Sequence, residues 1–203
     1  MATVIHTCYP LPDADIELFE GFFALAESDR WFTELLAHIA WEQGYIPCHG
    51  KLVPEPRLSA WYGDPGAHYT YSGVRHNPHP WNEVLLELKA RIEPTAEVGF
   101  NSVLLNCYRD GRDSVGWHSD AERELGRNPV IASVSFGGTR RFLLRHKRLA
   151  LRATIELTHG SLLLMRGATQ HHWRHQVPKT RQPVNPRINL TFRRIHSVDA
   201  ILG

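Results

Sequence analysis

The stretch PVIASVSFGGTRRFLLRHKRLALRATIELTHGSLLLM, residues 129–165, decides the fold of this 203-residue chain. It consists of short apolar and β-branched runs separated by pairs of turn-forming residues, a pattern typical of short strands. The same pattern continues on both sides of the stretch. We expect strands at 102–108, 130–136, 140–144, 154–157, 162–165, 172–177 and 188–195. Turn signals stand at Asp110-Gly111, Gly137-Gly138, His159-Gly160 and Gly167.

Seven or eight short strands at this spacing predict a sandwich or jelly roll. We therefore expect a mainly β fold, a double-stranded β-helix (jelly roll) braced by N-terminal helices. A length of 203 residues suits a single domain, 1–203. In this division, about 1–100 form the bracing segment and about 101–196 form the jelly-roll core.

The N-terminal part has helical periodicity, and we expect the first forty residues to be helical. Ser28 is the predicted N-cap of one helix, with Gly44 as its stop. A second helix is predicted between Pro80 and Pro94, and residues 47–73 are expected to form short strands and loops. The apolar positions of the two helices are Trp31, Phe32, Leu35, Leu36 and Ile39, and then Val84, Leu85, Leu88 and Ile92.

Composition excludes several classes of protein. No apolar run approaches the roughly 20 residues of a membrane span, and the first residues lack the pattern of a secretory signal. The three cysteines, Cys8, Cys48 and Cys107, are scattered, which suits a reducing compartment and neither a disulfide framework nor a CxxC zinc clip. We expect a cytoplasmic monomer without membrane association.

Charge is distributed unevenly along the chain. Residues 1–100 contain 6 basic and 14 acidic residues, whereas residues 101–203 contain 17 and 7. A basic surface of this kind either binds phosphate groups or is an ordinary solvated face, and composition leaves both interpretations open. The basic cluster consists of Arg140, Arg141, Arg145, Lys147, Arg148 and Arg152.

His118 and Asp120 stand two residues apart in GWHSDAE. On an extended segment this spacing puts both side chains on one face. Two imidazoles and one carboxylate form the facial triad that holds non-haem iron(II). The segment HHWRHQVP offers His171, His172 and His175 as the third ligand. As a strand it would place His171 and His175 on the same face, so periodicity does not choose between them.

The segment RINLTFR, residues 187–193, alternates strictly between apolar and polar residues. Its polar face carries Arg187, Asn189, Thr191 and Arg193. One interpretation is a half-exposed strand whose polar face meets water. The other is a dicarboxylate site, because a guanidinium grips a carboxylate through two hydrogen bonds and stays charged when buried. Asn106 and Tyr108 share a strand face and are candidates to complete that site.

The order N-x-Y, H-x-D, distal His and R-x-N-x-T-x-R resembles the AlkB family of iron(II)- and 2-oxoglutarate-dependent dioxygenases. The resemblance runs from about residue 56 to residue 195 and is greatest to the members that repair DNA in animals. It implies that His175 is the third metal ligand and that 2-oxoglutarate and dioxygen are co-substrates. The residues that the resemblance assigns to 2-oxoglutarate are Asn106, Tyr108, Arg187, Asn189, Thr191 and Arg193.

The resemblance also implies a reaction. An alkyl carbon on a base such as 1-methyladenine or 3-methylcytosine is hydroxylated, and the repaired base and formaldehyde are released. Alkylated DNA is the expected partner, and RNA is an alternative. Residues 1–100 then include the nucleotide-recognition segment. The substrate-binding residues expected from the resemblance are Arg57, Tyr69, Thr70, Tyr71, His49, Gly50 and Lys51.

One position departs from the animal repair enzymes. They carry a second acidic residue directly after the metal-binding aspartate, whereas this chain has Ala121 there and Glu122 next. We expect Glu122 to substitute, and the base preference stays open. Three other functions remain as alternatives: a non-catalytic nucleic-acid-binding jelly roll, a zinc hydrolase with the same His/Asp/His set, and an oxygenase acting on RNA or protein.

Overall fold

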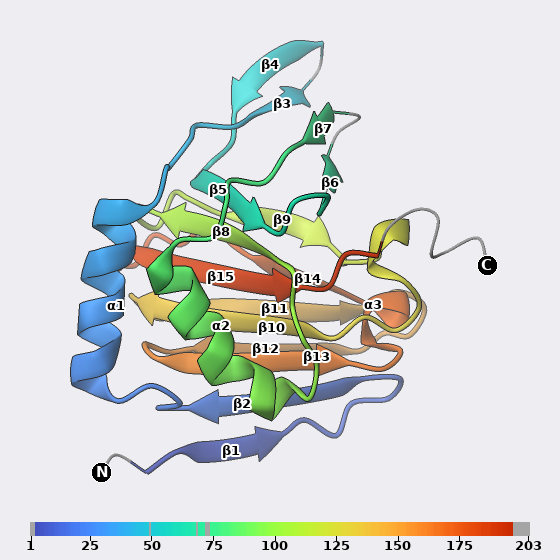
Figure 1. Cartoon of the computed structure of the whole chain (residues 1–203). Helices are drawn as coiled ribbons and strands as arrows, with labels where there is room; N and C mark the ends of the chain where they lie inside the picture. The colour runs from blue at the N-terminus through green and yellow to red at the C-terminus, as the bar shows by residue number, and fades with distance from the viewer. Residues whose placement is uncertain (1–2, 49, 68, 72–73, 197–203) are drawn as a thin grey trace.

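Two antiparallel sheets form the body of the molecule, which confirms the predicted jelly roll (Figure 1). The computed structural model describes residues 3–196 except 49, 68, 72 and 73; for 48, 69–71 and 74–76 it describes the backbone. The major sheet has the order β1 (Ile5–Cys8), β2 (Asp15–Glu20), β13 (Ser161–Arg166), β10 (Ile131–Gly137), β15 (Arg187–Arg193), β8 (Ser102–Tyr108) and β5 (Leu58–Gly63).

The minor sheet lies against the major sheet, and two hairpins stand apart from both. The minor sheet has the order β12 (Arg152–Leu157), β11 (Arg140–His146), β14 (Trp173–Val177) and β9 (Val115–His118). The hairpins are β3 (Tyr45–Cys48) with β4 (Lys51–Pro54) and β6 (Tyr69–Tyr71) with β7 (Val74–His76). The helices are α1 (Leu25–His38), α2 (Glu83–Ala96), α3 (Thr169–His172) and a 3-10 turn, η1 (Arg123–Leu125).

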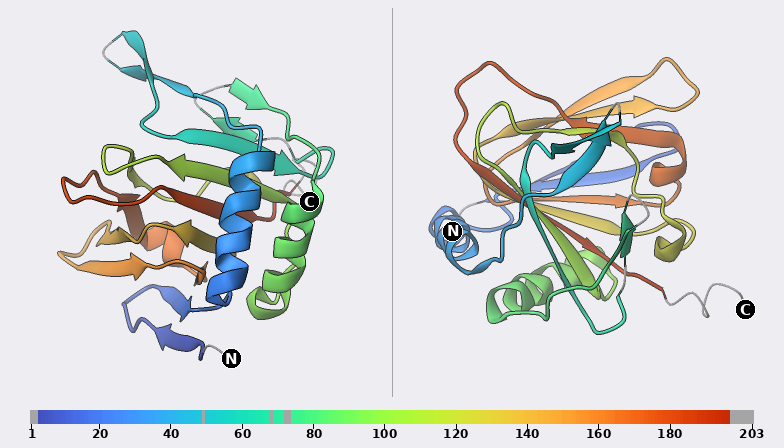
Figure 2. Two further views of the ribbon diagram at one scale, coloured as in Figure 1. Left: turned by 90° about the vertical axis from the view of Figure 1, so that its left-hand side faces the viewer. Right: turned by 90° about the horizontal axis from the view of Figure 1, so that it is seen from above.

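Both faces of the major sheet are covered, and β15 shows how. Its apolar residues Ile188, Leu190 and Phe192 pack with Leu88 and Ile92 of α2 in one core cluster. Helices α1 and α2 lie on this face of the sheet (Figure 2). A second apolar cluster belongs to the two sheets themselves and includes residues of β2, β11, β13 and β14. The polar face of β15 is therefore buried between the sheets.

The prediction that the first forty residues are helical is wrong before Leu25. Ile16 and Leu18 alternate with exposed or half-buried residues at a period of two, and both belong to the cluster between the sheets. Strand β2 pairs with β13 in the major sheet, and β1 pairs with β2 at its edge. Burial against the second sheet therefore selects a strand in a segment that we expected to be helical.

The predicted helix boundaries also need correction. Ser28 is not an N-cap: Ala24 holds that position, and the buried Ser28 hydroxyl donates to the Phe23 carbonyl. The helix ends at His38, well before Gly44. Helix α2 continues past Pro94 to Ala96, because a proline in the last turn removes a single hydrogen bond and the packing of this face compensates.

The predicted strands agree with the observed ones to within about two residues, except for His172, which belongs to α3 rather than β14. Helix α3 occupies the turn that brings the chain from β13 to β14. Within the described ranges, no helix combines the length and apolar character needed to cross a membrane.

Candidate active site

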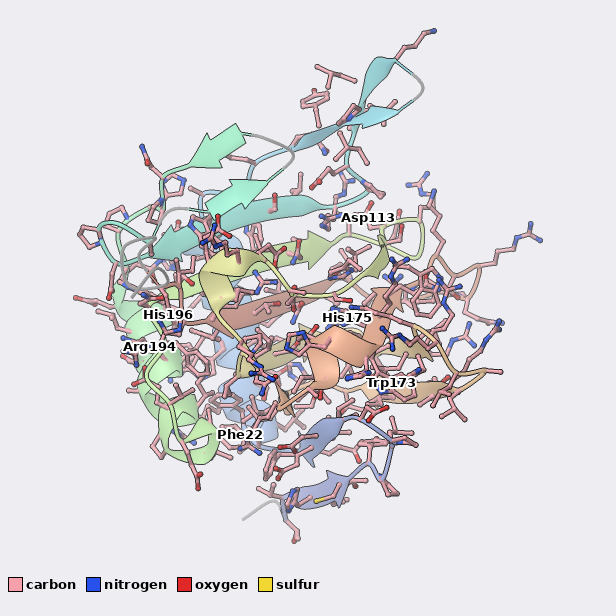
Figure 3. All side chains as sticks on the ribbon, turned by 90° about the vertical axis from the view of Figure 1, so that its right-hand side faces the viewer. Phe22, Asp113, Trp173, His175, Arg194 and His196 are labelled. Atoms are coloured by element: carbon pink, nitrogen blue, oxygen red, sulfur yellow. The ribbon has the colours of Figure 1, made fainter. Side chains whose placement is uncertain are left out.

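His118, Asp120 and His175 come together between the sheets, with one ligand atom of each within 4.8 Å of the others. The two Nε2 atoms are 3.1 Å apart. The carboxylate oxygens of Asp120 lie 4.0 Å from Nε2 of His118 and 3.8 Å from Nε2 of His175. Asp120 and His175 are buried and His118 is half-buried, so the cluster is open on one side. Figure 3 shows His175 among the packed side chains.

Strand pairing positions the two histidines. His175 on β14 is the register partner of His118 on β9, and neighbouring residues in an antiparallel pair share a face. Trp173 and Val177, two residues on either side of His175, are buried between the sheets, so the alternation of β14 directs His175 inward. His171 lies in α3 and is exposed. The structure therefore selects His175 over His171 as the third ligand, a choice that the periodicity of the sequence left open.

Contacts beyond the triad hold His118 and Asp120 in place. Nδ1 of His118 donates to the Gly116 carbonyl at 2.8 Å, so Nε2 carries the lone pair that faces the cluster. The backbone amide of Asp120 donates to Oε1 of Gln170, and Nη2 of Arg193 donates to Oδ1 of Asp120 at 2.7 Å. Gln170 was not predicted from the sequence, because its contact with Asp120 crosses 50 residues.

The donor set fits iron(II). Two unprotonated imidazole nitrogens at 3.1 Å repel one another unless a cation or a proton lies between them. For metal–nitrogen bonds of about 2.1 Å, ligands at right angles are about 3 Å apart. Two histidines and one carboxylate on one side of an open position are the facial arrangement of non-haem iron(II) sites. His118, Asp120 and His175 are therefore the residues that would hold the ion.

The charge states suit this role. Burial by itself raises the pKa of Asp120, but the positive charge of Arg193, with smaller effects of His175 and His118, lowers it to about 2. Burial, together with the neighbouring His118, lowers the pKa of His175 to about 3. At neutral pH the site thus presents a carboxylate and a neutral imidazole, the forms that bind a metal ion.

We expect the metal-free protein to lose stability as the pH falls from 6.5 toward about 3. In this window the unfolded chain protonates His175 and the folded chain does not, so a lower pH favours unfolding. Denaturant unfolding at about pH 7 and about pH 4 measures the loss. His175→Gln, which does not titrate, should lose less stability than wild type, and exposed His171→Gln should match wild type. Equal losses in all three proteins would contradict this assignment.

The polar face of β15 meets the same cavity, as the alternation of the sequence predicts. Arg187 is 1% exposed, and its Nη2 donates to Oγ of Ser135 at 2.9 Å. Its Nε and Nη1 have no hydrogen-bond partner in the described part of the chain. The guanidinium lies 5.2 Å from the ring centre of Tyr108. Burial lowers the pKa of Arg187 to about 10, so it stays charged at neutral pH.

A buried cation with two unsatisfied donors is costly unless an anion binds to it. No ion pair between Arg187 and a carboxylate occurs among the residues that the structure describes. The half-exposed alternative for β15 is thereby wrong, since all seven of its residues are buried. Arg187 is placed to bind a carboxylate of a ligand in the cavity.

Arg193 contacts the metal-binding triad, whereas Arg187 does not. Its contact with Asp120 joins the predicted co-substrate strand directly to the triad. Asn189 donates to Oγ of Ser133, and Thr191 donates to Oδ1 of Asn189. Ser133 and Ser135 of β10 were not predicted from the sequence as site residues. The alternation of ASVSF could have indicated them, because it puts both on the face opposite the apolar residues of this strand.

The cavity has a volume of about 460 Å³ and therefore suits a small co-substrate with a substrate group beside it. It is lined by the triad and by all six residues assigned to 2-oxoglutarate: Asn106, Tyr108, Arg187, Asn189, Thr191 and Arg193. Arg57 and Glu122 also line it. Arg57 is held inside: Nε donates to Oδ1 of Asn106 at 2.8 Å, and Nη2 pairs with Glu55 at 3.2 Å. The described contacts of Arg57 are thus with other residues of the cavity wall.

The remaining substrate residues lie elsewhere or outside the description. Gly50 and Lys51 are exposed on the β3–β4 hairpin and do not line the cavity. His49 and the side chains of residues 69–71, which include the predicted stacking residue Tyr71, lie outside the described part of the chain.

The predicted basic cluster is not a single surface. Arg140 is 3% exposed and donates to the carbonyls of Asp110, Asp113 and Pro178, so its place in a phosphate-binding face is wrong. Lys147 donates to the Gln170 carbonyl. Arg145 lies over the ring of Trp117 at 4.7 Å.

Comparison with known proteins gives the same family as the motifs. The model of the 2OG-Fe(II) oxygenase superfamily matches residues 15–193. The mouse "Alpha-ketoglutarate-dependent dioxygenase alkB homolog 3" is 46% identical over 189 residues, which cover 88% of this chain and 65% of that protein. The mouse "DNA oxidative demethylase ALKBH2" is 41% identical over 184 residues, which cover 85% of this chain and 77% of that protein.

The fold has a solved counterpart. The structure of OsALKBH1 superposes with a TM-score of 0.66 at 16% identity, covering 94% of this chain and all of that one. The chain spans less than two thirds of the length of its alkB homolog 3 relatives. Because the family model covers most of the chain and the ALKBH2 proteins are similar over most of their own length, the chain belongs to the AlkB family of 2-oxoglutarate- and iron(II)-dependent oxygenases.

Proposed function

We propose that this chain is a dioxygenase that removes alkyl groups from damaged DNA bases, such as 1-methyladenine and 3-methylcytosine, with release of formaldehyde. Iron(II), 2-oxoglutarate and dioxygen supply the oxidation of the alkyl carbon when bound. Support comes from the relatives, whose printed names include an α-ketoglutarate-dependent dioxygenase and a DNA oxidative demethylase.

The single observation that carries the proposal is the shared cavity of Arg187 and the His/Asp/His triad. A zinc hydrolase with the same triad has no need of a buried cation whose Nε and Nη1 are unsatisfied. A non-catalytic binding module has no need of the buried triad either. A dicarboxylate that spans from Arg187 toward the metal ligands satisfies both features.

The residues that line the cavity have different roles in the proposed reaction. Arg187 and Tyr108 would bind a carboxylate of 2-oxoglutarate, and Ser135 and the ring of Tyr108 hold the Arg187 guanidinium in place. Arg193 orients Asp120 and keeps it ionised. Burial between the sheets excludes water from the reacting groups, which strengthens each of these charge interactions.

Base recognition involves the open side of the cavity. Glu122, half-buried on the cavity wall, is two residues beyond Asp120, whereas Ala121 is exposed. A carboxylate there can accept a hydrogen bond from an exocyclic amino group of adenine or cytosine. We propose that Glu122 takes the role of the acidic residue that the animal repair enzymes carry at the position of Ala121.

The test is an anaerobic titration with iron(II) and 2-oxoglutarate, followed by oxygen and mass analysis of methylated oligonucleotides. Matched DNA and RNA strands carrying one 1-methyladenine or one 3-methylcytosine serve as substrates. Loss of one methyl group, with an equivalent of succinate, is the expected result on DNA. Succinate formation with demethylation only of RNA would move the function to that substrate, and no succinate with any oligonucleotide would refute the proposal.

We predict activity on both single- and double-stranded methylated DNA, with single strands favoured. Flipping a base from a duplex costs a few kcal/mol, which a large apolar residue at the gap partly recovers. The turn that resembles this wedge carries His49, which is smaller and more hydrated than phenylalanine. Rates on matched strands for wild type, His49→Ala and His49→Phe measure the effect. His49→Phe should raise the duplex rate; an unchanged duplex rate in His49→Ala would exclude the wedge role.

A further inference from the structure

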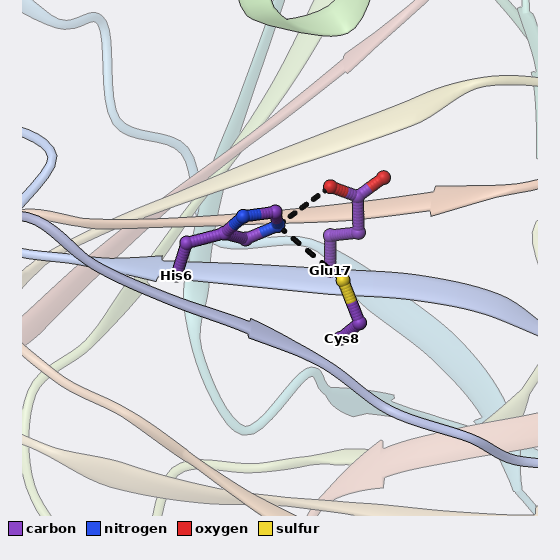
Figure 4. Close-up of side chains that lie close together, drawn as sticks. All are labelled: His6, Cys8 and Glu17. Atoms are coloured by element: carbon purple, nitrogen blue, oxygen red, sulfur yellow. Dashed lines mark hydrogen bonds and ion pairs between the residues drawn. The ribbon is translucent and has the colours of Figure 1, made fainter.

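A second group of metal-ligating side chains lies at the edge of the major sheet. It consists of His6 and Cys8 on β1 and Glu17 on β2, with one ligand atom of each within 4.8 Å of the others. Cys8 is the register partner of Glu17, and His6 shares the face of Cys8 two residues away (Figure 4). Sγ of Cys8 is 3.6 Å from Nε2 of His6, which is 2.7 Å from Oε2 of Glu17.

Neighbouring side chains contact two of these ligands. The ring of His6 stacks on Phe19, its register partner, with centroids 4.3 Å apart and an interplanar angle of 5°. The other carboxylate oxygen of Glu17, Oε1, pairs with Arg166 of β13. Arg166 is itself held, since its Nη2 donates to the Thr95 carbonyl of α2. Oε2 of Glu17 and Sγ of Cys8 both contact Nε2 of His6.

The separation of Cys8 and His6 is that of two ligands in a tetrahedral zinc site, and the separation of His6 and Glu17 is shorter. With zinc–sulfur bonds of about 2.3 Å and zinc–nitrogen bonds of about 2.0–2.1 Å, the sulfur and nitrogen are about 3.6 Å apart, as are Sγ of Cys8 and Nε2 of His6. Nitrogen and oxygen ligands are about 3.4 Å apart in the same geometry, so the hydrogen bond between His6 and Glu17 would open by roughly 0.7 Å. A rotation of the exposed His6 or of the Glu17 side chain is enough for this.

The cluster is separate from the cavity of the triad. Ile16 and Leu18 of β2 point between the sheets, so Glu17 and Phe19 point to the opposite face, which carries the helices. His6 and Cys8 also precede residue 15, where the match to the family model begins. The oxygenase chemistry therefore does not account for this group of side chains.

A third group, Asp13, His146 and His172, does not suit a metal ion. The backbone amides of Arg148 and Leu149 donate to Nδ1 of His146, so the ring proton is on Nε2, which faces Asp13 at 3.3 Å. Because Nδ1 of His146 already accepts from these two amides, the proton cannot move to it and Nε2 does not become free to bind a cation, whereas in His6 the proton can move from Nε2 to Nδ1 when an ion binds. Among the described residues, His6, Cys8 and Glu17 are the group outside the active site with a thiol and an imidazole together.

We propose that His6, Cys8 and Glu17 bind one zinc-class divalent ion, through Nε2, the Cys8 thiolate and Oε2, with water as the fourth ligand. Thiolate and imidazole favour zinc over the hard cations, and the two negative charges balance the ion. The ion would join β1 to β2 and so secure the edge strand of the major sheet.

Cobalt(II) added to the reduced whole protein tests the proposal, because cobalt bound to a thiolate gives a near-ultraviolet charge-transfer band. The active-site triad contains no sulfur and cannot produce that band. Wild type should show the band, complete by two equivalents because the triad also takes up cobalt, and should lose it when zinc is added. Cys8→Ser should lack the band, and His6→Ala should require at least about tenfold more cobalt, as for loss of a ligand contact.

Three variants control the experiment. His118→Ala should keep the band, which separates this site from the active site and from the proposed function. Cys48→Ser should keep it as a second cysteine change, and Glu20→Gln as a carboxylate change on the same strand. With His118→Ala in place to weaken the active-site triad, zinc should also raise the unfolding midpoint, and adding Cys8→Ser should abolish that rise. A missing band in wild type, or an equal band in Cys8→Ser, would overturn the proposal.

Discussion

Replacing Arg187 with alanine is expected to raise the 2-oxoglutarate concentration required for half-maximal turnover by about 30- to 4,000-fold. Removing one partner of a buried charge pair typically costs about 2–5 kcal/mol, and this range of factors is its equivalent. The bound carboxylate would lose a cation that is 1% exposed. Initial rates of succinate formation across a series of 2-oxoglutarate concentrations give the factor.

Two further variants make this result specific. Arg187→Lys keeps the charge and loses the two-pronged hydrogen bonding, so it should fall between wild type and alanine. Arg141→Ala, an exposed strand arginine opposite Glu156, should behave as wild type. Circular dichroism confirms that each variant folds. A requirement unchanged in folded Arg187→Ala would exclude Arg187 as the carboxylate-binding residue.

Replacing His175 with alanine is expected to lower turnover by more than about 100-fold. Changes in residues that merely support a metal ligand already cost about 10- to 100-fold, and loss of a ligand costs more. The ion would keep His118 and Asp120 as its two protein ligands. Anaerobic iron(II) titration in the presence of 2-oxoglutarate reports binding through a weak visible charge-transfer band, and succinate formation reports turnover.

The neighbouring histidines supply the matched controls. His171→Ala changes an exposed residue of α3 that does not line the cavity, so it should retain nearly full turnover and the visible band. His172→Ala should retain most of both, because His172 faces Asp13 rather than the triad. Full activity in His175→Ala, or loss of activity in His171→Ala, would show that the third ligand is assigned to the wrong histidine.

The sequence by itself determined the features that depend on neighbours along the chain. The strict alternation of residues 187–193 divides the strand into an apolar and a polar face, because side chains of a strand alternate with a period of two. The structure confirms that division, with Ile188, Leu190 and Phe192 against the helices. The turn signals likewise separate the short strands correctly. The order of motifs was sufficient to indicate the family.

Tertiary structure decided what depends on residues far apart in the chain. Periodicity left His171 and His175 equal, the resemblance favoured His175, and the short helix α3 takes His171 out of the strand. The pairing of Arg193 with Asp120 spans 73 residues. It makes Arg193 a partner of the triad, although local sequence shows only another arginine on the polar face.

The N-terminal strands show the same limit. Residues 15–20 were expected to be helical, and pairing with β13 together with burial of Ile16 and Leu18 makes them a strand. That pairing also places Glu17 beside Cys8 and His6, a group that was not predicted from the sequence. Local patterns specify faces and turns, whereas the free energy of burial and strand pairing selects which faces meet, and the ligand groups of this protein arise where they meet.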